Sequence, residues 1–321
     1  MTLVANLSAP EVTLRGDFIE GPEDIPIYVE TFGDPAATHK IVCIQGPLLR
    51  TPCFYMRCAQ LSEQACYIVV YDTPWHGLSI PWEDQGMFSS SPYVWPTPRL
   101  WVESLDAVRD HLGLFEEEIC LMGWSFGGQI LRHYIAQRGT GGIAGLILLG
   151  AILDADASLS DLADTSPPLA QEFRTLLKET APLDKRLDAL LSLVECLWHE
   201  RPGLEDYYLT LGDMIKSFWA FRGVSSMLLT AQGEAPLAET LRSVRVPTLL
   251  IQGRQDRLVT RTSTRQLVSL FQEGLLRLCE YDGCGHAPFL EHPDRFQQDV
   301  LGFLRSLEDQ EHRPDPWRAL T

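Results

Sequence analysis

Short apolar runs that alternate with amphipathic helical patterns are the feature that most constrains how this chain can fold. Strands of a parallel sheet are buried on both faces, so their sequences are almost entirely apolar. Helical patterns lie at residues 98–113, 126–138, 262–273 and 293–306. Five runs of the strand type are KIVCIQG (40–46), YIVVYD (67–72), EICLMGW (118–124), GLILLGA (145–151) and PTLLIQG (247–253). The alternation predicts an α/β protein with helices on both faces of its sheet.

Three further strands complete the predicted sheet. Residues 11–19 and 26–32 have the pattern of a β-hairpin, and LRLCEYD at 276–282 follows the helical pattern at 262–273. The expected architecture is a mostly parallel central sheet of about eight strands. The chain has 321 residues, which is enough for one sizeable core of this kind.

One long stretch, residues 153–236, interrupts the alternation. It holds no convincing strand, but it has helical patterns at 169–180, 183–200 and 204–219. Its place before the last two strands predicts a helical lid over the carboxyl edge of the sheet, where α/β proteins bind their ligands. An extra helical layer without ligand contact is the alternative. The predicted units are an α/β core (1–152 and 237–307), the helical lid (153–236) and a polar tail (308–321).

Charge excludes two classes of partner. The chain carries 43 acidic and 26 basic residues, so its net charge is −17, and no cluster of Lys and Arg is evident. Nucleic acid and anionic lipid would be repelled. We therefore expect a small-molecule substrate, no nucleic-acid partner and no membrane partner; the sequence does not fix the oligomeric state.

Location and metal content are predicted from the termini and the cysteines. The segment MTLVANLSAPEV lacks the pattern of a signal peptide, and the apolar stretch at 143–153 is too short to span a bilayer. Eight cysteines are scattered without a Cys-x-x-Cys pair. These features predict a cytoplasmic protein with reduced cysteines and no metal site.

The stretch LMGWSFGG contains a Gly-x-Ser-x-Gly motif centred on Ser125. A predicted strand precedes it and a predicted helix follows, which is the setting of a nucleophile elbow. Gly123 and Gly127 would let backbone pack closely against the turn. Ser125 would lie at a helix N-terminus, whose free N–H groups stabilise developing negative charge.

An activated serine needs a base, and the base needs an acid to orient it. Asp256 follows the predicted strand 247–253, and His286 lies in a glycine-rich loop after the strand 276–282. The carboxyl ends of parallel strands meet at one edge of the sheet. The order serine, acid, histidine therefore predicts a catalytic triad of Ser125, Asp256 and His286. Asp154, before the predicted lid, is the alternative acid.

In these sequence blocks the chain resembles the α/β-hydrolase superfamily, in particular its lidded serine esterases such as the pimeloyl carrier-protein methyl ester esterase. The resemblance covers about residues 12–307. It rests on the serine motif, on Gly253-Arg254-Gln255-Asp256, on the GHAPF and His292-Pro293 blocks, and on YDTPWHGLS at 71–79. It implies an α/β-hydrolase fold with a helical lid, and no cofactor. Epoxide hydrolases and dehalogenases are disfavoured, since they place Asp where this chain has Ser125.

The resemblance also implies an oxyanion hole of two backbone N–H groups. Phe126, after the nucleophile, would supply one. The second donor is expected after Gly46, but Pro47 has no N–H, so we expect Leu48 to donate instead. The side chain of Gln45 is a possible replacement.

The expected function is hydrolysis of a carboxylic ester, lactone or thioester through an acyl-enzyme. The same triad would serve C–C bond hydrolysis or acyl transfer, and a non-catalytic ligand-binding protein is the alternative outside enzymes. His76 and Asp72 are expected mainly to support their loop. The candidate substrate contacts are Gln45, His76, Trp95, Trp124, Trp198 and Trp219.

Overall fold

The computed structural model of the protein describes residues 15–44, 46, 57–64, 66–79, 97–178, 180–220 and 236–311. Eight strands form one sheet in the order β1-β2-β4-β3-β5-β6-β7-β8. Strands β1 and β2 form the predicted hairpin and β2 pairs antiparallel with β4, whereas all other pairs are parallel. Their bounds are β1 Arg15–Glu20, β2 Pro26–Phe32, β3 His39–Ile44, β4 Cys66–Tyr71, β5 Ile119–Trp124, β6 Ile143–Leu149, β7 Thr248–Gly253 and β8 Leu276–Tyr281. The predicted fold class is confirmed.

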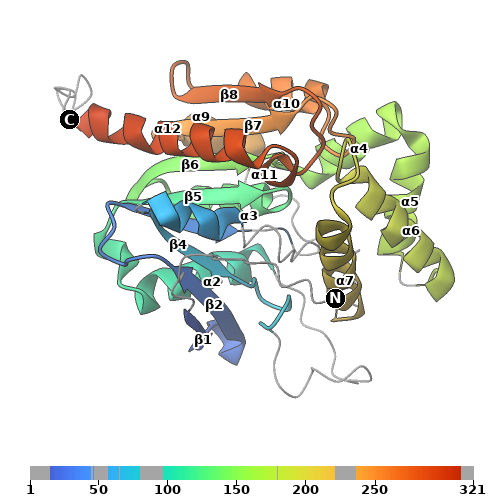
Figure 1. The fold of residues 1–321 in the computed structure, drawn as a ribbon, viewed down its shortest axis with the longest axis horizontal. Helices are drawn as coiled ribbons and strands as arrows, with labels where there is room; N and C mark the ends of the chain where they lie inside the picture. The colour runs from blue at the N-terminus through green and yellow to red at the C-terminus, as the bar shows by residue number, and fades with distance from the viewer. Residues whose placement is uncertain are drawn as a thin grey trace, which may run out of the picture.

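Helices cover both faces of the sheet (Figure 1). Two core clusters result, and the apolar part of β3 is divided between them: Ile41 and Cys43 join one cluster, and Val42 and Ile44 join the other. Helix α12 packs on the first side, and α2 and α3 pack on the second. Outside residues 153–236 the described helices include α2 Pro98–His111, α3 Gly127–Arg138, α9 Leu237–Ser243, α10 Arg261–Val268, α11 Pro288–Glu291 and α12 Pro293–Glu311, with short 3₁₀ helices at Pro22–Asp24, Gln60–Gln64 and Leu114–Glu116.

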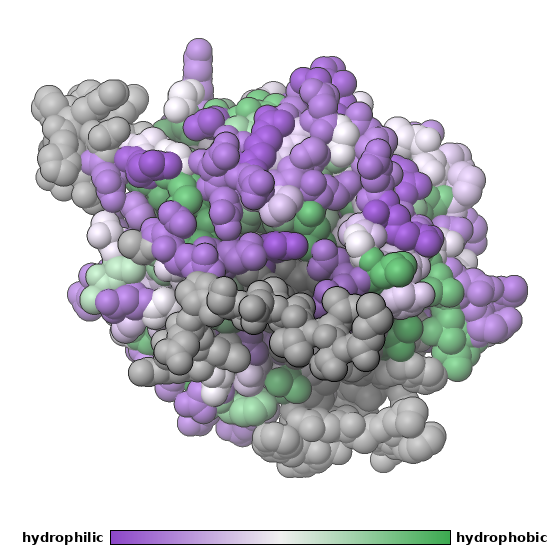
Figure 2. Space-filling view, viewed as in Figure 1, coloured by the Kyte–Doolittle hydropathy of each residue, from purple (hydrophilic) through white to green (hydrophobic). Residues whose placement is uncertain are grey.

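Residues 153–236, the insert, contain four described helices and no strand among their described residues. The helices are α4 Ala155–Thr165, α5 Pro167–Leu177, α6 Leu183–Cys196 and α7 Leu204–Ala220. They gather beyond one end of the sheet (Figure 1). In Figure 2 hydrophobic surface is visible on the side of the molecule where these helices lie. Leu183 and Leu191 of α6 are exposed.

Three helix predictions differ from the structure. Helix α4 was not predicted, because its sequence ADASLSDLADT is rich in Asp and Ser, which are weak helix formers. Helix α10 ends at Val268 rather than at residue 273, since Leu270 and Phe271 close turns onto the residues three before them. Helix α12 continues to Glu311, beyond residue 308 where the polar tail was predicted to start. No helix in the described part of the chain has both the length and the hydropathy needed to cross a bilayer.

Candidate functional site

Ser125 lies on a sharp turn between β5 and α3, as the Gly-x-Ser-x-Gly motif predicted. Its φ is 53°, a left-handed conformation that costs a residue other than glycine about 1–3 kcal/mol. Surrounding bonds maintain it: the Ser125 N–H donates to Leu149 O at 3.0 Å, and the Ser125 carbonyl accepts from Ile152 N–H at 2.9 Å. A Cβ at Gly123 would lie 3.0 Å from the backbone of Gly127, so the tight turn requires glycine there.

His286 and Asp256 come to the same edge of the sheet from the loops after β8 and β7. The Ser125 Oγ lies 2.9 Å from His286 Nε2, and His286 Nδ1 lies 2.8 Å from Asp256 Oδ2. All three residues are buried, with at most 8 % of their surface exposed. Because a carboxylate oxygen only accepts, the proton of a neutral His286 lies on Nδ1, which leaves Nε2 free to accept the Ser125 O–H.

Further donors hold the carboxylate of Asp256. Its Oδ1 accepts the N–H groups of Leu258 at 2.8 Å and Val259 at 2.9 Å. Its Oδ2 also accepts from Gln252 Nε2 at 2.9 Å. Gln252, the residue before Gly253 on β7, was not identified from the sequence, although it contacts the acid directly. Hydrogen bonds of this kind fix the orientation of a carboxylate and hence of the imidazole that it contacts.

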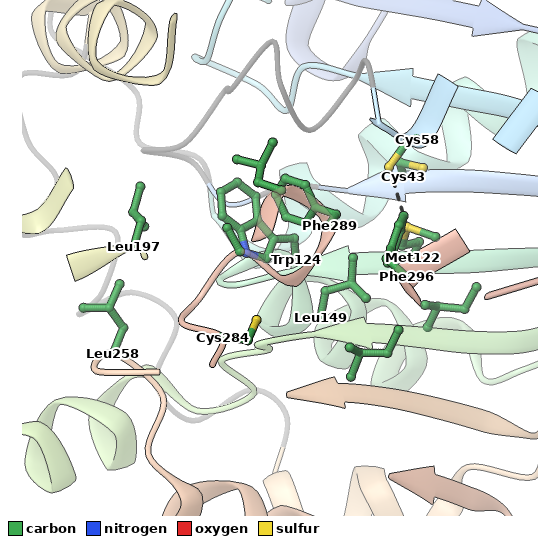
Figure 3. Close-up of a cluster of buried hydrophobic side chains, with 14 of the residues drawn as sticks. Cys43, Cys58, Met122, Trp124, Leu149, Leu197, Leu258, Cys284, Phe289 and Phe296 are labelled. Carbon is green, nitrogen blue, oxygen red and sulfur yellow. Dashed lines mark hydrogen bonds between the residues drawn. The ribbon is translucent and has the colours of Figure 1, made fainter. Parts of the chain in front are cut away.

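The indole of Trp124 supports the loop that carries His286. It is completely buried, and its Nε1–H donates to the His286 carbonyl at 2.9 Å. Its ring lies edge-on to Phe289 at 4.8 Å between centroids, and Figure 3 shows the two side by side. The sequence suggested a substrate contact for Trp124, but its side chain contacts the protein's own loop and has no exposed surface.

The loop after β4 contains Asp72 and His76. Asp72 Oδ2 accepts the Leu78 N–H at 2.8 Å, and the Ser79 hydroxyl donates to the Asp72 carbonyl at 2.7 Å. His76 is 4 % exposed and its Nδ1 lies 2.8 Å from the Pro74 carbonyl. Burial lowers the pKa of His76 to about 3, so the ring is neutral. These contacts favour loop support over substrate contact, as the sequence did.

Asp154, the alternative acid, has another place in the structure. Its side chain caps the N-terminus of α4 by accepting the Ala157 N–H at 2.9 Å, and it lies 3.7 Å from Arg132 Nη1. His286 Nδ1 is bonded to Asp256 instead. The assignment of Asp154 as the acid is therefore not supported by the geometry.

The remaining predicted residues fall into two groups. Trp198 is buried in the core cluster to which both the insert and the sheet contribute, with 2 % of its surface exposed. Gln45, Leu48 and Trp95 lie outside the described residues, as does the side chain of Trp219. The described neighbour Gly46 passes close to the nucleophile turn: a Cβ there would lie 2.7 Å from Phe126 Cβ and 3.2 Å from Phe126 N. The segment that was predicted to complete the oxyanion hole thus begins beside Phe126.

The described residues contain no group of three or more His, Cys, Asp or Glu side chains placed to hold a metal ion. What the arrangement offers chemically is a buried hydroxyl, a base and an acid in series at the start of a helix. Nucleophilic attack on a carbonyl by Ser125 is the reaction that such a series can promote.

The chain is similar in sequence and in fold to several known proteins. The model of the alpha/beta hydrolase family matches residues 42–298. The pimeloyl-[acyl-carrier protein] methyl ester esterase of Xylella fastidiosa is 25 % identical over 88 % of this chain and 100 % of its own length. A non-heme haloperoxidase of Rhodococcus erythropolis is 28 % identical over 62 % of this chain and 72 % of its own. The solved structure of an esterase from Rhodococcus sp. ECU1013 superposes with a TM-score of 0.71 at 23 % identity, covering 92 % of this chain and 99 % of that one.

Proposed function

Because the chain belongs to the alpha/beta hydrolase family, we propose that it is a serine hydrolase that cleaves a carboxylic ester, lactone or thioester. The observation that carries the proposal is the buried series of contacts from Ser125 Oγ through His286 to Asp256. The esterase among the relatives, which aligns over its whole length, supports the choice of substrate class.

In the proposed reaction, Ser125 Oγ attacks the carbonyl carbon while His286 Nε2 takes its proton. The tetrahedral intermediate collapses as His286 returns that proton to the leaving alcohol, or to the thiol of a thioester. Water then attacks the acyl-enzyme with His286 again acting as base, which releases the acid and restores Ser125. Asp256 holds the ring and stabilises its charged form. The N–H groups of Phe126 and Leu48 are the proposed oxyanion donors.

We further propose that the insert is a lid that sets substrate choice. Its backbone contacts the loop of His286, since the His286 N–H donates to Leu197 O at 2.8 Å. The substrate is a small molecule, and no cofactor enters the reaction. A cytoplasmic location is supported by the seven described cysteines, all of which are buried and free of disulfide bonds.

A panel of p-nitrophenyl esters of increasing chain length tests the proposal. Ser125→Ala and His286→Ala should each abolish turnover while the protein stays folded, and the double variant should be little worse than either single one. Losses that multiply in the double variant would argue that the two residues do not act as one unit. Full turnover by Ser125→Ala would reject the proposed nucleophile, and the ligand-binding alternative predicts no turnover of any ester.

A further inference from the structure

The connection between α6 and α7 contacts the loops of both the acid and the histidine. We call residues 195–199, which run from the last turn of α6 into this connection, the bridge. From the acid loop, Arg257 Nη2 donates to the Glu195 carbonyl and, at 3.3 Å, to the Trp198 carbonyl. From the same loop, Leu258 joins the buried cluster that contains Leu197, and both are labelled in Figure 3. Arg257, the residue directly after Asp256, is therefore hydrogen-bonded to the insert.

On the histidine side the contact is made through backbone and one carboxylate. The His286 N–H donates to Leu197 O at 2.8 Å. Glu291 Oε1 accepts the Gly285 N–H at 2.7 Å, and Glu291 Oε2 accepts the His199 N–H at 2.7 Å. One carboxylate thus joins the residue before His286 to the bridge. A Cβ at Gly285 would lie 2.6 Å from His199 N, so only glycine permits this approach.

The surroundings of Glu291 make these bonds hard to replace. Burial raises the pKa of this carboxyl, and hydrogen bonds from the N–H groups of His199, Gly285 and Glu200 offset only part of that rise. The N–H groups of Gly285 and His199 would lose a charged acceptor if the carboxylate were removed. Hydrogen bonds to an ionised acceptor are roughly twice as strong as neutral ones, which suits a contact that fixes a loop.

We propose that Glu291 is a positioning residue for His286: its carboxylate ties the histidine loop to the bridge, so that the insert helps to hold the imidazole between Ser125 and Asp256. The proposal rests on the proposed serine hydrolase function. It assigns the insert a part in catalysis that is separate from substrate choice. A displacement of about 1 Å in a catalytic group can cost on the order of 10²-fold in rate, so the loss of this tie should be measurable.

Glu291→Gln tests the proposal, because it preserves shape but turns one acceptor oxygen into an amide donor that faces a backbone N–H. With p-nitrophenyl acetate we expect kcat to fall by about tenfold or more while KM changes little, since a short ester makes few contacts with the insert. Glu280→Gln is the matched control. Among the described residues, the Glu280 carboxylate binds Arg254 and Arg261 and contacts neither His286 nor Asp256, so both constants should stay near those of the wild type.

A fluorophosphonate probe separates positioning from folding. Phosphonylation forms the Ser125 Oγ–P bond and breaks the P–F bond, fluoride leaves, and His286 takes the serine proton. A misplaced imidazole lowers the rate constant of labelling, whereas loss of folded protein lowers only the final labelled fraction. We expect Glu291→Gln to lower the rate constant. Unchanged kcat, or a loss confined to the labelled fraction, would overturn the proposal.

Arg257→Gln supplies a second arm that does not depend on the stability of Glu291→Gln. It releases the bridge from the acid loop, so kcat should fall with KM little changed, and Arg257→Lys should recover part of the loss. Arg254→Gln, in the same loop but bonded to Glu280 and Asp282, is its control. Wild-type kcat in Arg257→Gln would count against the bridge. Labelling or turnover that survives in Ser125→Ala would instead reject the serine hydrolase function itself.

Discussion

At the scale of single residues, the site depends on which atom donates and which accepts. The Asp256 carboxylate can only accept, and it receives His286 Nδ1–H together with the N–H groups of Leu258 and Val259. This arrangement selects the tautomer in which Nε2 accepts the proton of Ser125. In the proposed mechanism Asp256 therefore acts through orientation as well as through charge.

Asp256→Asn should lower kcat by about 10⁴, because the amide can donate to Nδ1 and favours the wrong tautomer. Steady-state kinetics on a p-nitrophenyl ester would measure this. Asp154→Asn is the comparison: asparagine also caps helices, so kcat should stay near the wild-type value. A larger loss in Asp154→Asn than in Asp256→Asn would show that the acid is misassigned.

Trp124→Phe should remove the Nε1–H that donates to the His286 carbonyl while keeping an aromatic ring in place. A buried carbonyl left without its partner costs about 1–3 kcal/mol, so the free energy of unfolding in urea should fall. Because the carbonyl belongs to His286, we expect kcat to fall as well. Trp101→Phe is the matched control. Trp101 is equally buried, but its Nε1 has no hydrogen-bond partner within the described structure, so only packing is lost. Equal losses in both variants would show that the Trp124 hydrogen bond contributes nothing.

At the scale of elements, loops at the carboxyl edge place the site, and each loop needs its own polar support. The loop after β4 is an example. Within the loop, the Asp72 carboxylate accepts the Leu78 N–H and the Asp72 carbonyl accepts the Ser79 hydroxyl. The Ser79 hydroxyl oxygen in turn accepts the N–H of Tyr28 on β2. His76 is buried in the same loop as a neutral ring. Such a ring stabilises the fold only while it stays unprotonated.

This burial predicts how stability depends on pH. The pKa of His76 is about 3 in the folded protein and about 6.5 when unfolded, so the unfolded chain takes up the proton first as pH falls. Stability is therefore present above about pH 6.5 and is lost from there towards pH 3. At pH 5 the loss from this group is about 2 kcal/mol relative to pH 8. The measurement is the free energy of unfolding in urea at pH 5 and at pH 8. In His76→Gln the difference between these two free energies should be smaller than in the wild type by about the same amount. An unchanged difference would mean that His76 is not buried as a neutral ring.

Elements were predictable from sequence where burial dictates composition. The centres of strands β3 to β7 are apolar because their alternate residues, such as Ile41 and Val42, enter different core clusters. Helix α4 escaped prediction because a cap at Asp154 and packing against the core outweigh the weak propensity of its Asp and Ser residues. Sequence patterns alone do not reveal such tertiary support.

At the scale of the whole molecule, the sheet brings together residues that are far apart in sequence. Ser125 and His286 are 161 positions apart, and their loops meet because β5 and β8 end at the same edge. Order and strand position sufficed to predict this meeting. The contacts made by Gln252, Arg257 and Glu291 were not predictable from the sequence. Arg257 and Glu291 bond to backbone groups of the insert, and a backbone group places no requirement on the side chain of its residue that a sequence motif could show.

The central claim is that Ser125 is a nucleophile activated by His286 and Asp256. The most direct measurement is the mass of the whole protein after treatment with a fluorophosphonate probe, followed by peptide mapping of the adduct. We predict one adduct per chain, located on Ser125, absent in Ser125→Ala and formed much more slowly in Asp256→Asn. No adduct on the folded wild-type protein, or an adduct that persists in Ser125→Ala, would contradict the claim.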